Sequence, residues 1–116
     1  MHYKRADRVA AVIKEEISKF LLHGLKDPAL GFVTITKVDV TDDVRNAKVH
    51  YSVYGDESQK EQAAEALERA SGRIRGEIGK YLTLRFVPTL KFIYDDRNEY
   101  ADHIEQLLKK IKDEKK

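Results

Sequence analysis

The sequence predicts one domain of the α+β class, and three observations support this prediction. The chain has 116 residues, which suits one domain and is short for two. Apolar residues recur at helical spacing in some segments and alternate with polar residues in others, which predicts both helices and strands. No internal repeat or low-complexity linker divides the chain. We therefore expect a single domain over residues 1–112, followed by a short charged tail at 113–116.

The first third of the chain predicts a helix followed by two strands. Residues 6–23 place apolar side chains along one side of a helix, and Gly24 is expected to end it. Residues 31–40 and 44–54 are rich in β-branched residues and flank a polar turn, which predicts an antiparallel hairpin. The apolar phase changes between Ile35 and Val38, which indicates a β-bulge or a strand buried on both faces.

The central segment predicts two helices that share one buried side. Its apolar line runs from Ala63 to Leu82 and passes through Gly72, Gly76 and Gly79. Each glycine inside a helix costs about 1 kcal/mol relative to alanine. We therefore expect a break or kink near Ser71 and Gly72, within residues 70–73.

The last part of the chain predicts a third strand and a final helix. Leu90, Phe92 and Tyr94 alternate within residues 89–94, and apolar residues from Tyr100 to Ile111 lie on one side of the helix that follows. The predicted order is therefore helix, strand, strand, helix, kink, helix, strand, helix, with the helices on one face of a three-stranded sheet.

The composition excludes several classes of protein. The chain has no cysteine, which excludes disulfides, zinc ribbons, iron–sulfur clusters and thiol catalysis. The four histidines are scattered, and no phosphate-binding glycine loop followed by lysine is present. We therefore expect no enzymatic activity, no metal and no cofactor. No apolar run approaches the roughly 20 residues that cross a bilayer, so we expect a cytoplasmic protein without membrane contact.

Charge is strongly segregated along the chain although the net charge is only +2. Residues 39–68 carry eight acids and three bases, whereas residues 69–91 carry six bases and one acid. Four of those six bases are arginines, whose guanidinium groups suit phosphate. This pattern predicts a local surface that binds an anion, and nucleic acid is the favoured candidate.

The order of elements resembles the type II KH fold, an RNA-binding α+β module. The resemblance sharpens to the ribosome-binding factor A family over essentially the whole chain. The matching stretches are RADRV at 5–9, KDP at 26–28, AKV at 47–49, ALERASGRIR at 66–75, LRFVP at 84–88 and FIYD at 92–95.

This resemblance implies a non-catalytic factor that binds the free 30S subunit and assists late maturation of 16S rRNA, including its 5′ end. It also implies a role in growth in the cold. The implied partners are the 30S subunit and 16S rRNA, with ribosomal proteins and other assembly factors as further candidates, and we expect a monomer.

The resemblance also implies that an Ala-x-Gly kink replaces the Gly-x-x-Gly loop of KH domains, and Ala70, Ser71 and Gly72 occupy that place. If a helix starts there, its free N–H groups and dipole favour phosphate, and neighbouring basic residues reinforce this preference. The candidate RNA-binding residues are Arg5, Arg8, Ala70, Ser71, Gly72, Arg73, Arg75, Lys80 and Arg85.

Several of these residues also allow a purely structural interpretation. Ala70 to Gly72 could be an ordinary helix end, Arg5 and Arg8 could lie on a solvated face, and Arg85 could pair with an acid of the second helix. Gly76 and Gly79 spell Gly-x-x-Gly, but Glu77 between them would repel phosphate, so close helix packing is the better explanation. Among the aromatic residues we expect Tyr51, Phe86 and Phe92 inside and keep Tyr54 and Tyr81 as candidate contacts.

A different class of function uses the opposite charge. The acidic segment 39–68 could dock on a basic ribosomal protein, which would make the chain a protein-interaction module. Binding to RNA should weaken steeply with salt because phosphate contacts release counterions, and this dependence separates the two hypotheses.

Overall fold

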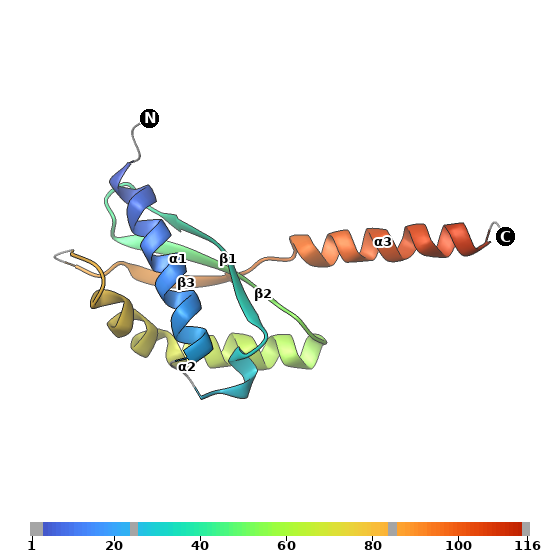
Figure 1. Cartoon of the computed structure of the whole chain (residues 1–116), viewed down its shortest axis with the longest axis horizontal. Coiled ribbons are helices and arrows are strands. Elements are labelled where there is room, and N and C mark those ends of the chain that lie inside the picture. Colours follow the sequence, from blue (N-terminus) through green and yellow to red (C-terminus); the bar gives the residue numbers. More distant parts are fainter. Residues whose placement is uncertain (1–3, 24–25, 84–85, 115–116) are drawn as a thin grey trace.

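The computed structural model describes residues 4–23, 26–83 and 86–114, and describes side chains within these ranges except at 97–103, 113 and 114. It confirms an α+β domain with a three-stranded sheet (Figure 1). The elements are α1 (Arg5–His23), the short 3-10 helix η1 (Pro28–Leu30), β1 (Val33–Val40), β2 (Asn46–Val53), α2 (Glu57–Gly79), β3 (Thr89–Tyr94) and α3 (Arg97–Glu114). Gly24 lies outside the described residues.

The sheet has the order β1-β2-β3, with β2 in the centre. β1 and β2 form the predicted antiparallel hairpin, and their register shifts between Ile35 and Lys37, which confirms the predicted bulge. The hydroxyl of Thr36, the residue inside the bulge, donates a hydrogen bond of 2.9 Å to the buried carboxylate of Asp95. The bulge therefore ties the edge of the sheet to the end of β3.

β3 pairs with β2 in parallel, so the chain must cross back over the sheet between these two strands. α2 makes this crossover, and Arg75 holds its return. The guanidinium of Arg75 donates to the carbonyl oxygens of Val87 and Pro88, at 2.7 and 3.2 Å. These bonds fix the segment that leads into β3 against the side of α2.

α1 and α2 cover one face of the sheet and enclose one core, with α1 crossing in front of the strands (Figure 1). β2 alternates as expected, with Ala47, Val49, Tyr51 and Val53 buried. The helices contribute apolar lines at helical spacing. Their buried residues are Ala6, Val9, Ile13, Ile17 and Leu21 of α1, and Ala63, Ala66, Leu67, Ala70, Ile74 and Ile78 of α2.

α2 is a single helix from Glu57 to Gly79, so the expectation of two separate helices is wrong and only a kink remains of the predicted break or kink. Burial explains this, since Ala70, Ile74 and Ile78 continue the apolar line across the glycines, whereas Gly72 and Gly76 face open space. The ribbon of α2 nevertheless changes direction near its yellow middle (Figure 1). There the hydroxyl of Ser71 donates to the carbonyl of Glu68 at 2.8 Å, a bond that often bends helices.

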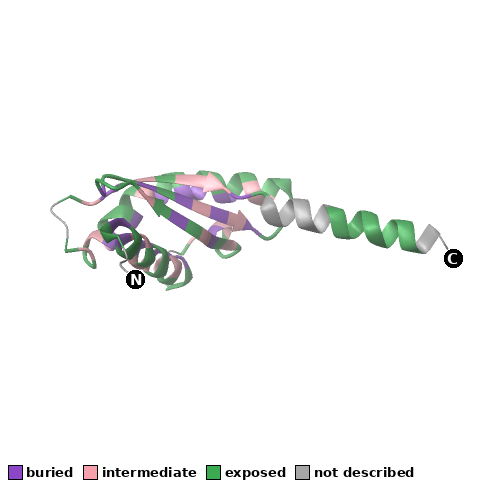
Figure 2. Cartoon of the chain, turned by 90° about the horizontal axis from the view of Figure 1, so that it is seen from above, coloured by how far each residue is buried: buried purple, intermediate pink, exposed green. Residues whose placement is uncertain are grey.

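α3 departs from the expectation that the helices pack on one face. It projects away from the sheet, and the part whose burial is described is exposed (Figures 1 and 2). Its apolar side chains are open to solvent, with exposed fractions from 37% at Ile104 to 60% at Leu108. The molecule consequently measures 63 × 39 × 19 Å.

Candidate nucleic-acid interface

A basic groove lies between η1 and the middle of α2. Its volume is about 290 Å³. It is lined by Lys26, Asp27, Leu30, Ala66, Arg69, Ala70 and Arg73. Arg69 and Arg73 are one helical turn apart, so both guanidinium groups lie on the same side of α2. Lys26 adds a third positive charge from the other wall.

The single acid that lines this groove, Asp27, caps η1 and offsets one of the three positive charges. The carboxylate of Asp27 accepts a hydrogen bond of 3.0 Å from the backbone of Ala29 and so caps η1. The other oxygen of Asp27 lies 3.6 Å from Arg69, which ties the loop to α2. Within the described part of the chain, neither Lys26 nor Arg73 makes an ion pair. These two cations are therefore available for an anion.

The structure separates the two arginines that the sequence placed together. Arg73 lines the groove, whereas Arg75 turns to the other side of α2 and binds the carbonyl oxygens before β3. Residues two apart on a helix face different directions, which explains the difference. Because α2 is continuous here, it also lacks the free N–H groups that a helix start would offer. The expected phosphate site at a helix N-terminus is therefore wrong, and the side-chain charges remain.

The Ala-x-Gly segment contributes to two surfaces. Ala70 is buried beneath the basic groove. Ser71 instead lines a second hollow, of about 430 Å³, between α2 and β3. The remaining lining residues of this hollow are Tyr51, Ala64, Glu68, Leu90, Lys91 and Phe92. Gly72 is exposed, and a side chain added there would meet nothing within 4 Å.

The remaining candidate residues do not gather at this groove. Lys80 follows the end of α2 and its ammonium donates to Glu77 at 2.9 Å. That hydrogen bond and the charge of the carboxylate raise the pKa of Lys80. Arg5 and Arg8 are exposed at the start of α1, about 20 Å along the helix from its end beside α2. Arg85 lies outside the described residues.

The aromatic residues follow the predictions with one exception. Tyr51 is buried and Phe92 half-buried, whereas Tyr54 and Tyr81 are exposed. Phe86 is 65% exposed, so its expected burial is wrong. It lies in the segment after α2, where Pro88 rather than Phe86 enters the interior.

Gly76 and Gly79 do not form a phosphate-binding loop, because both lie within α2. A side chain at Gly79 would approach the Cγ2 atom of Val87 to 3.0 Å, so this glycine permits the predicted close packing. Gly76 meets nothing within 4 Å and has no such role.

The acidic segment does not form one surface. Asp42 and Asp43 lie in the turn before β2, at one end of that strand. The acids from Asp56 onward follow the other end of β2. Eight strand residues separate these groups by about 26 Å. The Asp43 carboxylate is also engaged locally: bonds from the Thr41 hydroxyl and then from the Arg45 backbone hold its pKa below the usual value.

Sequence reasoning missed Lys26 and Arg69 as members of the groove. The spacing of Arg69 and Arg73 is a signal that could have joined them, because residues four apart share a helix side. Lys26 carries no such signal, since only the folded structure brings η1 against α2. Among the described residues no cluster of three metal-ligating side chains occurs, and none of the described helices is long and apolar enough to span a bilayer.

Fold and surface together define a small α+β domain with a basic groove on one helix. Comparison with known proteins agrees, since the family model of ribosome-binding factor A matches residues 5–108. The chain therefore belongs to the ribosome-binding factor A family. It is 47% identical to ribosome-binding factor A of Geobacter sulfurreducens, over 97% of this chain and 96% of that protein.

Solved structures show the same fold. The crystal structure of ribosome-binding factor A from Thermus thermophilus is 25% identical, with a TM-score of 0.67 over 77% of this chain and 94% of that one. The solution structure of a Thermotoga maritima protein described as a ribosome-binding factor A is 35% identical, with a TM-score of 0.60 over 79% and 91%. A homology model of Thermus thermophilus ribosome-binding factor A has also been fitted into a cryo-EM map of a complex of 30S with ribosome-binding factor A.

Proposed function

We propose that this protein is a non-catalytic assembly factor that binds the free 30S subunit through 16S rRNA. Membership of the ribosome-binding factor A family supports this function, as does the fitted 30S complex of the Thermus protein. The observation in this chain that carries it is the basic groove, because three cations converge on one hollow beside η1. Guanidinium groups bind phosphate oxygens with matched geometry.

The charge of α2 orients the protein on the RNA. The first half of this helix bears Glu57, Glu61, Glu65 and Glu68 against the single base Lys60, whereas the part from Arg69 onward carries three arginines against Glu77. A phosphate backbone repels the first half and attracts the second. RNA that enters the groove therefore runs beside η1 and the middle of α2, and away from the start of α2.

The proposed role extends to late maturation of 16S rRNA, including its 5′ end, and to growth in the cold. It is performed in the cytoplasm by a monomer that binds RNA and leaves cleavage to other proteins. A bound protein stabilises the RNA conformation that it contacts, by mass action. This effect is what an assembly factor without an active site can supply.

The test compares two pairs of substitutions with equal change of charge. Lys26→Ala with Arg73→Ala removes the two cations of the groove that pair with no acid among the described residues, and Lys109→Ala with Lys110→Ala removes two exposed cations from α3. We expect the groove pair to weaken binding to purified 30S subunits by about tenfold or more and to lower the salt slope by about two units. Equal losses from both pairs, with both variants folded, would contradict a role of the groove.

A further inference from the structure

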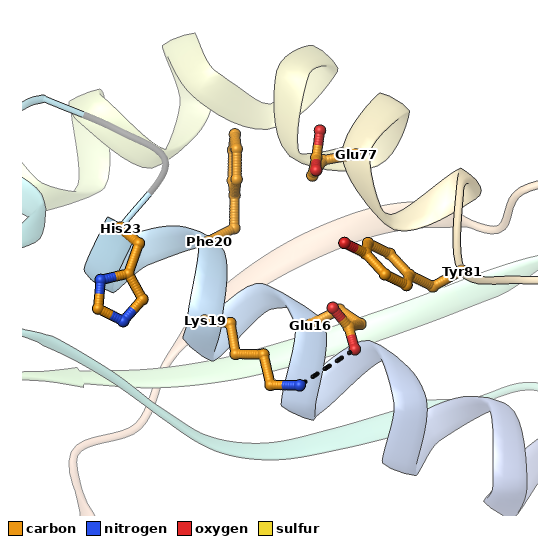
Figure 3. A pocket seen from close by; sticks show the side chains of 6 residues that line it. All are labelled: Glu16, Lys19, Phe20, His23, Glu77 and Tyr81. Carbon is orange, nitrogen blue, oxygen red and sulfur yellow. Dashed lines mark ion pairs between the residues drawn. The ribbon is translucent and has the colours of Figure 1, made fainter.

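A third hollow lies between the last turns of α1 and of α2, and its lining differs from that of the basic groove. Its volume is about 260 Å³. Glu16, Lys19, Phe20 and His23 come from α1, and Glu77 and Tyr81 come from the end of α2 and the turn after it (Figure 3). It therefore combines two carboxylates, the ammonium of Lys19, the imidazole of His23 and the rings of Phe20 and Tyr81, from segments far apart in the sequence.

The carboxylate of Glu16 is largely withdrawn from water and shares the ammonium of Lys19 with Glu15. Its side chain is only 15% exposed. The ammonium of Lys19 lies 3.6 Å from Glu16 but 3.1 Å from the exposed Glu15, so Lys19 is drawn outward (Figure 3 shows the longer contact). The hydrogen bond to Glu15 is also the main cause of the raised pKa of Lys19. One ammonium therefore serves two carboxylates, which leaves Glu16 the more distant of the two and open to a second cation.

The carboxylate of Glu77 is held by a replaceable partner. Glu77 is 30% exposed, whereas Lys80, its partner at 2.9 Å, is 69% exposed. An exposed lysine pair contributes little free energy because both side chains lose conformational freedom and water screens the charges. A cation that binds from the hollow can therefore replace Lys80 at small cost.

The two aromatic rings give the hollow its walls. Phe20 is half-buried and packs against the core, while Tyr81 is 54% exposed. In Figure 3 the Tyr81 hydroxyl points into the space between Phe20 and Glu16. Aromatic faces attract cations, and guanidinium groups also stack on them. Carboxylates repel phosphate, so this hollow suits a cation where the basic groove suits an anion.

We propose that this hollow binds an arginine side chain that a basic protein segment presents to the domain. A guanidinium is planar and carries five N–H donors, so it can bond to Glu16 and Glu77 while it lies against a ring. The ammonium of lysine is a compact point charge and cannot make both kinds of contact at once. This contact with protein goes beyond the proposed contact with RNA and uses different residues.

The first test measures the preference for guanidinium directly. Nα-acetyl-arginine amide and Nα-acetyl-lysine amide are titrated into the full chain, and amide chemical shifts are followed by NMR. We expect arginine to shift the resonances of Phe20, Glu77 and Tyr81 and to bind about tenfold more tightly than lysine. Equal binding of the two probes, or shifts elsewhere on the molecule, would overturn the proposal.

The second test removes charge without changing shape. Glu16→Gln with Glu77→Gln should weaken binding of the arginine probe by about tenfold or more, and Glu61→Gln with Glu105→Gln is the control with the same charge change at exposed positions. Tyr81→Ala, which alters an exposed ring, should also weaken it and serves if the double variant does not fold. An unchanged affinity in a folded variant of the hollow would refute the proposal. These variants keep all the cations of the basic groove. Binding of the 30S subunit by the groove can therefore fail or succeed independently of binding of arginine by the hollow.

Discussion

α1 and α3 are both amphipathic helices of similar length, 19 and 18 residues, yet only α1 covers its apolar side. Val9, Ile13, Ile17 and Leu21 of α1 are buried. The corresponding stripe of α3 faces solvent and comprises Ile104, Leu107, Leu108 and Ile111. The difference shows that an apolar stripe predicts a helix and its apolar face. It does not predict whether that face will be buried against the rest of the domain.

The two faces of the sheet explain why α3 does not pack against it. α1 and α2 together occupy the apolar face of three short strands. The opposite face carries polar residues along the central strand, with Lys48, His50 and Ser52 alternating with the buried residues. An apolar helix gains little free energy on such a face. α3 therefore continues outward from the end of β3.

The largest expected effect on stability comes from a direct test of the comparison between α1 and α3. Ile17→Ala empties a site that is fully buried and should lower the free energy of unfolding by about 2–5 kcal/mol. Leu108→Ala removes a side chain that is 60% exposed and should change it by less than about 0.5 kcal/mol. Urea unfolding followed by circular dichroism measures both. A large loss at Leu108 would mean that α3 is covered in solution.

A smaller effect sharpens the contrast between the packed region and the binding surface. Arg75→Ala loses two hydrogen bonds to backbone carbonyls and should destabilise the fold by about 1–2 kcal/mol. Arg73→Ala should leave the free energy of unfolding within about 0.5 kcal/mol, because Arg73 makes no ion pair within the described residues. The same urea titrations compare the two variants. If both are equally stable, the bonds of Arg75 do not hold the connection to β3.

The start of α2 offers a third comparison, because two reciprocal hydrogen bonds form a capping box there. Asp56 accepts from the Gln59 backbone at 2.9 Å while the Gln59 side chain accepts from the Asp56 backbone at 2.8 Å. Asp56→Ala should cost about 1 kcal/mol of unfolding free energy. Glu61→Ala, at an exposed position one turn later, is the control and should be nearly neutral. A neutral Asp56→Ala would show that packing alone fixes this helix start.

The smallest effect should be a gain. Gly72→Ala adds a methyl group into open space within a helix and should raise the free energy of unfolding by about 0.5–1 kcal/mol. Gly79→Ala should lose this gain, because its new methyl approaches Val87 to 3.0 Å. Thermal unfolding ranks the two. Should Gly72→Ala destabilise the protein, the bend in the middle of α2 requires glycine after all.

Much of the fold follows from local patterns that the sequence makes visible. The change of phase after Ile35 predicted the bulge, and alternation along residues 44–54 predicted the buried face of β2. The glycines of α2 were misjudged because their propensity cost is local, whereas the burial of Ile74 and Ile78 that offsets it depends on the whole domain.

The candidate site was harder to predict because it is assembled by tertiary contacts. Arg73 was identified from charge, but its separation from Arg75 depends on which sides of α2 face η1 and β3. Lys26 joins the groove because η1, with its buried Leu30, packs against α2, where Asp27 also lies 3.6 Å from Arg69. The direction of each side chain in the folded helix, rather than its position in a basic run of the sequence, determines which basic residues line the groove.

The detachment of α3 has a consequence for how the molecule is made. Among the residues whose side chains are described, the core and the apolar residues packed on it end at Tyr94, and every strand and both covering helices precede α3 in the chain. Domains emerge from synthesis N-terminus first. Because β3 pairs with β2 across the whole of α2, the sheet closes only when Tyr94 has emerged, and α3 is the segment that follows it. The core can therefore fold while its own chain is still being translated.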